Sequence, residues 1–404
     1  MSPETPVAEF LALLTKEWVA YGSEGVSLRS EIQAIAHAHG ARAEIQIQAD
    51  SAVLTVEEGH VVQTITVVSD QQITRLDRFT DLRGVMIRAK SGDADLEELS
   101  RQVVAIAKSP RIYPEWAKAL GIVLFTIGFS VNVQATWAEV GFAALTGGAV
   151  ALIVMVADRV ERVSLLAAFI AAVTVSVIVL VIFNNADVEG GPILLMIPAL
   201  FFFIPGDVLS ASMFELAAGR ITAGAAQLVY SIFLLMLLFV GVVVGTALTG
   251  TDTSVLFAEA VPAEFPDVVP WLGWVLFAFG FMLAFSVRLD DFGWVLLVTL
   301  VAFGAQQGTT ALFGEVVGAL LASTAMIATA SWVSRDPARP PVVVLALCGF
   351  FVLTVGALGL EGFTALVSGE PVAGFTDLLS MLTIAMAIAL GLLTGAVLVN
   401  RATR

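Results

Sequence analysis

Long apolar runs separated by short polar clusters make up the chain from about residue 118 onward, whereas the preceding part shows shorter periods. A helix needs about 20 apolar residues to cross a hydrocarbon core of roughly 30 Å. By that criterion the pattern predicts ten membrane spans, three of them short or broken. They cover approximately residues 119–137, 139–157, 163–183, 192–206, 224–248, 269–287, 292–306, 311–333, 341–360 and 377–399.

The first 117 residues have the periods of a small soluble domain. Helical periodicity around 7–20, 28–39 and 94–108 flanks two alternating stretches, AEIQIQA and AVLTVEEGHVVQTITVV. We therefore expect an α/β domain with a few strands and three or four helices. No charged start followed by a short apolar core is found near Met1. We thus expect no cleavable signal peptide and a cytoplasmic location for this domain.

The apolar part of the chain contains an internal repeat. The stretches that begin at Gly121 and Gly273 share Gly, Val, Leu and Phe positions at a constant offset of 152. A second set of matches, which includes Gly206 with Gly356, follows at an offset of 150. Each copy holds five predicted spans, and because five is odd the second copy must enter the membrane from the other side. The sequence therefore predicts an all-α membrane domain of two inverted five-helix repeats, an arrangement typical of secondary transporters.

The basic residues indicate how the spans are oriented. Twelve of the 20 Lys and Arg lie at or before Lys118, and the later arginines all fall on one side of the ten-span arrangement. Lys and Arg accumulate in cytoplasmic loops. We therefore expect both termini in the cytoplasm and the loop at 249–268, which has no basic residue, outside.

Composition agrees with a multi-pass protein of the cell (inner, cytoplasmic) membrane, since 58% of the residues are hydrophobic and 14% are charged. Four parts are expected. They are an N-terminal soluble α/β domain (1–117), a first transmembrane repeat (118–249), an extracytoplasmic loop (250–268) and a second transmembrane repeat (269–404).

Several function classes are disfavoured. The net charge of −15 argues against nucleic acid as a partner. The one cysteine, Cys348, lies in an apolar run and is expected to be packed there. His37 and His39 are two apart on a predicted helix, so they point to opposite sides and do not form a metal pair. With no catalytic constellation apparent, we expect neither an enzyme nor a bound cofactor or metal.

The stretch FFFIPGDVLSAS, residues 201–212, breaks the fourth predicted span. From Pro192 to Pro205 there are 14 residues, or about 21 Å of helix, which is too short to cross the bilayer alone. Pro205 removes a backbone donor and Gly206 relaxes the chain, so the helix should end inside the membrane. A second short helix is expected to begin at Asp207 or Ser210.

A helix start at this depth is a candidate substrate site. Its free amide groups and positive dipole end favour a carboxylate, while Asp207, Ser210 and Ser212 offer partners to an ammonium or hydroxyl group. A small zwitterion fits these groups. Around Gly356, in LTVGALGLEG, the break recurs in weakened form, so this glycine is included in the predicted site. The alternative is a simple kink at Pro205, with Asp207 capping a helix at the cytoplasmic surface.

Other polar residues are secondary candidates. Glu315 is ionisable and lies near or within the eighth span, so it is a candidate for proton coupling or substrate contact, or else marks the outer end of a helix. The glycine pairs at 241–245 and 391–395 are read as faces for close helix packing. Polar residues that could line a pathway, or lie at the interface, are Asn132, Asn184 and Gln227.

The sequence resembles the threonine/serine exporters, whose relatives include succinate exporters split into two small subunits. The resemblance rests on GVSLRSEI (25–32) followed by Gly40, on YPEWAKALG (113–121) and on IPGDVLSASMFELAAGRITAGAAQL (204–228), together with the five-plus-five layout. It implies efflux of small hydroxy amino acids driven by the proton motive force. Pro205-Gly206 matches the family's Pro-Gly. In the second half, where relatives often repeat it, this chain has Thr354-Val355-Gly356.

We therefore expect a secondary transporter that exports threonine, serine or a related small carboxylate. Its partners would be that substrate and the lipid bilayer, with a homo-oligomer as an open option. Two alternatives remain. One is an exporter of a dicarboxylate such as succinate. The other is a membrane-anchored sensor that does not transport.

Overall fold

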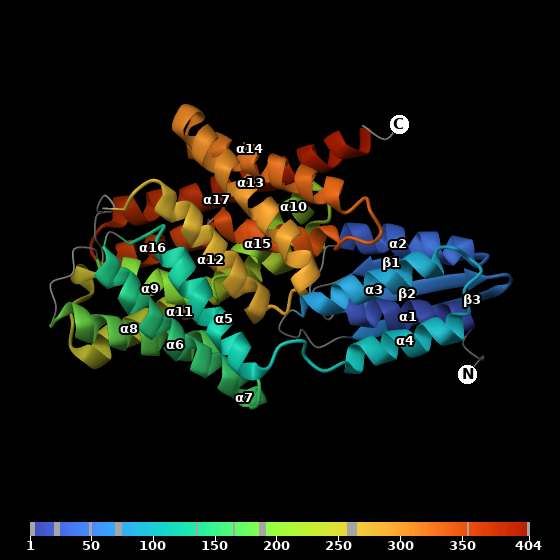
Figure 1. Cartoon of the computed structure of the whole chain (residues 1–404), viewed down its shortest axis with the longest axis horizontal. Helices are drawn as coiled ribbons and strands as arrows, with labels where there is room; N and C mark the ends of the chain where they lie inside the picture. The colour runs from blue at the N-terminus through green and yellow to red at the C-terminus, as the bar shows by residue number, and fades with distance from the viewer. Residues whose placement is uncertain are drawn as a thin grey trace. The chain divides into compact units, whose positions relative to one another are not determined.

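The structure is a computed structural model, and it describes residues 5–19, 25–47, 51–68, 75–134, 136–164, 166–185, 191–256, 265–353 and 355–401. Part of the predicted outer loop (257–264), Thr354 and the last three residues lie outside the described residues. The chain divides into two compact units (Figure 1). The first, here the N-terminal unit, comprises residues 1–112 with 285–291 and 333–345. The second, here the membrane unit, comprises residues 113–284, 292–332 and 346–404.

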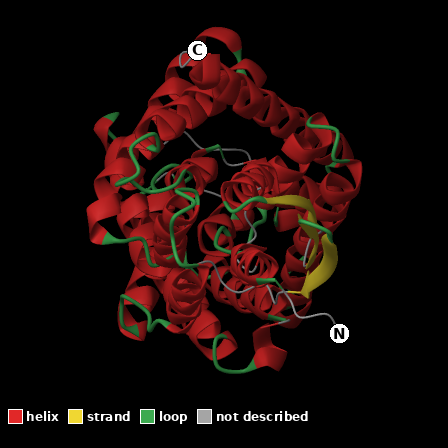
Figure 2. Cartoon of the chain, turned by 90° about the vertical axis from the view of Figure 1, so that its right-hand side faces the viewer, coloured by secondary structure: helices red, strands yellow, loops and turns green. Residues whose placement is uncertain are grey.

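The N-terminal unit contains a three-stranded antiparallel sheet in the order β1-β2-β3, yellow in Figure 2. Its strands are β1 (Ala41–Ile47), β2 (Ser51–Glu58) and β3 (Val61–Val68). Side chains of β1 and β2 alternate between buried and accessible positions, because one face of the sheet packs against helices.

Four helices complete this unit. They are α1 (Pro6–Val19), α2 (Gly25–Ala38), α3 (Leu76–Ala89) and α4 (Leu96–Lys108). The helices α1 and α2 pack on the sheet, and α4 packs against α1 and α3. The small α/β domain expected from the sequence is confirmed, and α3 is the helix for which no range was predicted. Its apolar side chains are interrupted by charged residues that have specific partners.

Those partners lie in the segments 285–291 and 333–345. The Arg83 Nη1 atom donates to Ser334 Oγ at 2.6 Å and to the Arg339 carbonyl at 3.1 Å. Asp81 accepts from Arg288 Nη1 at 3.1 Å. The α3 helix therefore holds two segments that are distant in the chain, with a separation of 207 residues between Asp81 and Arg288 and of 251 between Arg83 and Ser334.

The membrane unit confirms a multi-pass membrane protein. Among the described residues, six helical stretches are long and apolar enough to cross a membrane. They are α6 (Trp137–Ala157), α11 (Ile221–Thr249), α13 (Leu289–Phe313), α14 (Glu315–Val333), the apolar part of α17 (Pro371–Arg401), and Val342–Val367, which consists of two consecutive helices on either side of Thr354.

The other four predicted spans coincide with shorter helices, so the structure meets the length criterion at six places rather than ten. These helices are α5 (Glu115–Ser130), α8 (Ala167–Phe183), α9 (Pro192–Leu200) and α12 (Val268–Ala284). The short elements α7 (Glu161–Ser164) and η1 (Thr253–Val255) lie in connections.

The predicted break in the fourth span is confirmed. The helix α9 ends at Leu200, and α10 (Gly206–Ala217) begins with Pro205 as its N-cap residue. The second half has a corresponding pair, α15 (Val342–Val352) and α16 (Val355–Val367). A continuous helix is prevented in the first half because proline lacks the amide hydrogen that the helical ladder needs.

Glycines bring α5 and α12 into close antiparallel contact. A methyl group added to Gly128 would lie 2.3 Å from the Phe277 amide nitrogen and 2.7 Å from the Gly273 carbonyl oxygen. One added to Gly121 would lie 2.8 Å from the Gly280 carbonyl oxygen. Any larger residue at these positions would push the backbones apart, so the glycines set the distance between the two helices.

Candidate functional site

The two helix breaks meet inside the membrane unit. A methyl group added to Gly356 would lie 3.2 Å from the Gly206 α-carbon and 2.2 Å from Ile204 Cγ2. The first turns of α10 and α16 therefore approach each other backbone to backbone, which glycine permits because it has no side chain. The positive dipole ends of both helices lie near this crossing point, although the Gly206 amide donates to the Ile204 carbonyl at 2.9 Å and is therefore not free for a ligand.

The structure groups the predicted site residues of the first half along α10. Pro205 and Gly206 form its start, and Asp207 lies half-buried in its first turn. Ser210 and Ser212 are buried. Their hydroxyl groups donate within the helix, at 2.9 Å from Ser210 to the Gly206 carbonyl and at 2.6 Å from Ser212 to the carbonyl three residues before it. Both hydroxyl hydrogens are therefore used within the helix, and only the buried serine oxygens are left as acceptors.

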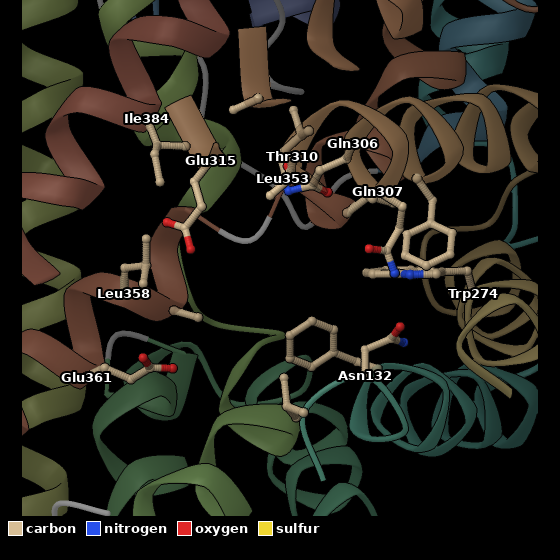
Figure 3. A pocket seen from close by; sticks show the side chains of 16 residues that line it. Asn132, Trp274, Gln306, Gln307, Thr310, Glu315, Leu353, Leu358, Glu361 and Ile384 are labelled. Carbon is tan, nitrogen blue, oxygen red and sulfur yellow. The ribbon is translucent and has the colours of Figure 1, made fainter. Parts of the chain in front are cut away.

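A cavity of about 330 Å³ lies beside the second break (Figure 3). Its buried lining includes Phe129, Val352, Leu353 and Ala357. Polar side chains also line the cavity. They are Asn132 at the end of α5, Trp274 on α12, Gln306, Gln307 and Thr310 on α13, Glu315 at the start of α14 and Glu361 on α16.

Two carboxylates face this cavity. Figure 3 shows the carboxyl groups of Glu315 and Glu361 turned toward the open space from α14 and α16. Glu315 is exposed and Glu361 is half-buried. Asp377 on α17 interacts through like charge with both of them. No lysine or arginine is among the described residues that line the cavity, so its field is negative.

The wall formed by α12 and α13 carries hydrogen-bond donors. Trp274 is 2% exposed, and its indole N–H has no hydrogen-bond partner among the described residues. Gln307 lies near it in Figure 3, and Gln306 lies near Thr310 and Leu353. Asn132 donates to the Gly128 carbonyl at 3.2 Å, which leaves its side-chain oxygen free to accept. A buried donor without a partner is unfavourable unless a ligand or water supplies the acceptor.

A cluster of aromatic side chains extends from the cavity lining at Phe129. Phe129 stacks on Phe201 with ring centroids 3.9 Å apart. Phe201 in turn lies 5.6 Å from Phe351, and Phe125 lies 4.2 Å from Phe277. Phe201 follows α9 directly and Phe351 lies in the last turn of α15, so the cluster is attached to both broken helices. Motion of either break would disturb this layer.

The structure joins some sequence candidates and separates others. It brings Glu315 and Asn132 into one cavity with Gly356's neighbour Ala357. Asp207, Ser210 and Ser212 do not line that cavity. Asn184 is exposed and donates to Thr251 Oγ1 at 3.2 Å. Gln227, whose side-chain oxygen is buried without a described partner, also lies outside it.

Glu361 is the residue that sequence reasoning missed. The signal was present, because an ionisable residue within an apolar stretch of spanning length is functional by default. Glu361 lies inside LTVGALGLEG, a stretch of which only Gly356 is part of the predicted site. Among the described residues, no group of three His, Cys, Asp or Glu side chains could hold a metal ion.

Comparisons with known proteins fit this arrangement. The family described as "Putative threonine/serine exporter" matches residues 9–249. A probable threonine/serine exporter from Mycobacterium tuberculosis (strain ATCC 25618 / H37Rv) is 22% identical over 334 residues, which is 80% of this chain. The chain spans 62% of the length of that relative. No solved structure matches significantly. Since the family match covers more than half of the sequence, the chain belongs to the threonine/serine exporter family.

Proposed function

We propose that the protein is a secondary transporter that exports a small hydroxy amino acid, threonine or serine, at the expense of the proton motive force. The observation that carries the proposal is the polar cavity beside the crossing of two broken helices. Irregular backbone at membrane depth is tolerated only where protein or a water-filled cavity surrounds it, and transporters use such sites for substrates.

Two inverted five-helix repeats would provide alternating access. The antiparallel contact of α5 with α12 supports this, because Gly121 and Gly273 are equivalent in the repeat and each lies against the other helix. The order of elements supports it too, since a broken pair precedes the last long helix in each half. In this proposal the four shorter helices complete ten spans. Residues 1–117 and the C-terminus are cytoplasmic and 250–268 lie outside.

The substrate would contact the crossing itself. The positive dipole end of α10 at Pro205-Gly206 and the start of α16 at Gly356 would face its carboxylate, with Asp207, Ser210 and Ser212 near its other polar groups. Leaving the crossing, it would enter the cavity, because residues on both sides of the second break line that space. Glu315 would then meet it or carry the coupled proton.

A flux measurement tests the proposal. Purified protein in liposomes is given labelled threonine, serine, alanine and succinate under an imposed proton gradient, with an uncoupler as control. We expect gradient-dependent movement of the hydroxy amino acids. Movement of succinate alone would favour the dicarboxylate alternative, and no flux of any compound would favour a sensor.

A further inference from the structure

We propose that Glu361 and Glu315 bind the ammonium group of the substrate in the cavity, and that the Trp274 N–H on the facing wall binds its carboxylate. This assignment rests on the proposed function, since it concerns the same substrate. Beyond that function, the assignment names the residues that would favour binding of a zwitterionic amino acid over a dicarboxylate.

The acidic wall lacks a countercharge of its own. Glu361 and Glu315 take part in none of the ion pairs found among the described residues, and the same holds for Asp377. Their charged neighbours are one another. An ammonium group placed between such carboxylates relieves their repulsion and gains charge-assisted hydrogen bonds.

The opposite wall supplies an independent indication of a ligand. The Trp274 indole is almost fully buried, yet its N–H donor has no protein partner among the described residues. The ring is held in place by Phe277, with centroids 5.0 Å apart, and by Phe303 at 5.8 Å. Figure 3 shows the ring reaching toward the open space, across the cavity from Glu361 and Glu315. It therefore offers a fixed donor to a carboxylate, directly or through a water.

The size and charge of the cavity limit what it can take. About 330 Å³ lies near the lower end of the range for ligand pockets, which suits a small metabolite. A dicarboxylate would bring a second negative charge to a wall that has no basic lining residue. Like charges at close range disfavour binding, so the acidic wall acts against dianions.

Equilibrium binding to the purified full-length protein tests the assignment. The ligands are L-threonine, N-acetyl-L-threonine, which keeps the carboxylate but has no ammonium, and succinate. The variants are Glu361→Gln, Glu361→Asp, Glu315→Gln and Trp274→Phe. Glu370→Gln is the matched control, because Glu370 is exposed and does not line the cavity. Size-exclusion profiles and thermal unfolding identify variants that fail to fold.

We expect Glu361→Gln to weaken threonine binding about tenfold or more, as for loss of a charged hydrogen-bond partner. Glu315→Gln should weaken it less, because Glu315 is exposed, and Glu361→Asp should retain part of the affinity. Trp274→Phe should weaken threonine and N-acetylthreonine alike. Wild type should bind threonine much more tightly than the other two ligands, and Glu370→Gln should behave as wild type.

Other results overturn the assignment. They are equal wild-type affinity for threonine and N-acetylthreonine, wild-type affinity in folded Glu361→Gln, or no binding of threonine by wild type. Binding that follows the expected pattern without any flux in liposomes would refute the proposed transport function while leaving the ammonium site intact. Threonine flux that is unchanged in Glu361→Gln and Glu315→Gln would refute the ammonium site while leaving the proposed transport function intact.

Discussion

Gly206 and Gly356 lie against each other where two broken helices cross, with 3.2 Å between the Gly206 α-carbon and a methyl group placed on Gly356. The two glycines are also equivalent in the internal repeat, at an offset of 150 residues. Equivalent positions of two repeats can touch at a pseudo-symmetry axis. The crossing is thus a second place where the two halves would meet, besides the contact of α5 with α12.

The two glycines differ in their tolerance of a side chain. A methyl group on Gly356 would lie 2.2 Å from Ile204 Cγ2, whereas one on Gly206 would lie no closer than 3.4 Å to any neighbour. We expect Gly356→Ala to lower the free energy of unfolding by about 1–3 kcal/mol through overpacking, and Gly206→Ala to change it little. Thermal unfolding in detergent measures both.

A double mutant checks the cause. Ile204→Ala removes the clashing methyl group, so Gly356→Ala should cost less in that background. Strictly additive effects of Ile204→Ala and Gly356→Ala on the free energy of unfolding would show that the contact with Ile204 does not cause the destabilisation by Gly356→Ala.

Helix packing gives a second prediction. A methyl group on Gly241 would lie 2.5 Å from the Ala172 side chain, but one on Gly141 would meet nothing within 4 Å. Gly241→Leu should therefore reduce the yield of folded protein strongly, and Gly141→Leu should not. The yield of monodisperse protein after size exclusion compares them. Similar yields for the two variants would contradict the packing role.

The hydrogen bonds of α3 to the segment 333–345 give a third prediction. Arg83 donates to Ser334 and to the Arg339 carbonyl, so Arg83→Ala should destabilise the N-terminal unit by about 1.5–3 kcal/mol. Protease cleavage within 333–345 should become faster. Arg101→Ala, which removes an exposed pair with Glu98, is the matched control and should have little effect. Unchanged cleavage in Arg83→Ala would argue against this contact.

The effect of replacing the neighbouring Asp81 on stability should depend on pH. Burial raises the pKa of Asp81 above its ordinary value, and the Arg288 guanidinium opposes this without cancelling it. A carboxyl group with a raised folded-state pKa favours folding more as pH falls toward that pKa and less at neutral pH. Asp81→Asn should therefore be neutral or slightly stabilising at pH 7, and the benefit should vanish in acid. Marked destabilisation at pH 7 would show that the pair with Arg288 dominates.

Labelling tests the proposed orientation. In a Cys348→Ala background, cysteine replaces Ser254, which is exposed in the predicted outer loop, or Ala338, which is exposed in the segment 333–345. An impermeant thiol reagent added to intact cells should label the first and spare the second. Equal labelling of both positions would contradict the predicted ten-span topology.

Much of the fold could be predicted, because short periods indicate buried faces in the N-terminal unit and long apolar runs indicate helices of spanning length in the membrane unit. The break at Pro205-Gly206 was predictable, since proline lacks the amide hydrogen for the helical ladder. Span lengths were harder to predict, because α5 and α12 end earlier, and α8 begins later, than their apolar runs suggest. The cavity could not be predicted. Glu361, Glu315 and Trp274 lie on three helices, and only tertiary packing brings them to one space.

The most direct test of the central claim is gradient-driven threonine flux per folded protein in liposomes, compared between wild type, Gly206→Leu and Gly141→Leu. A leucine at Gly206 would fill the crossing of the two broken helices, whereas a side chain at Gly141 points into open space. We expect near-complete loss of flux in Gly206→Leu and wild-type flux in Gly141→Leu. Wild-type flux in folded Gly206→Leu would contradict the central claim.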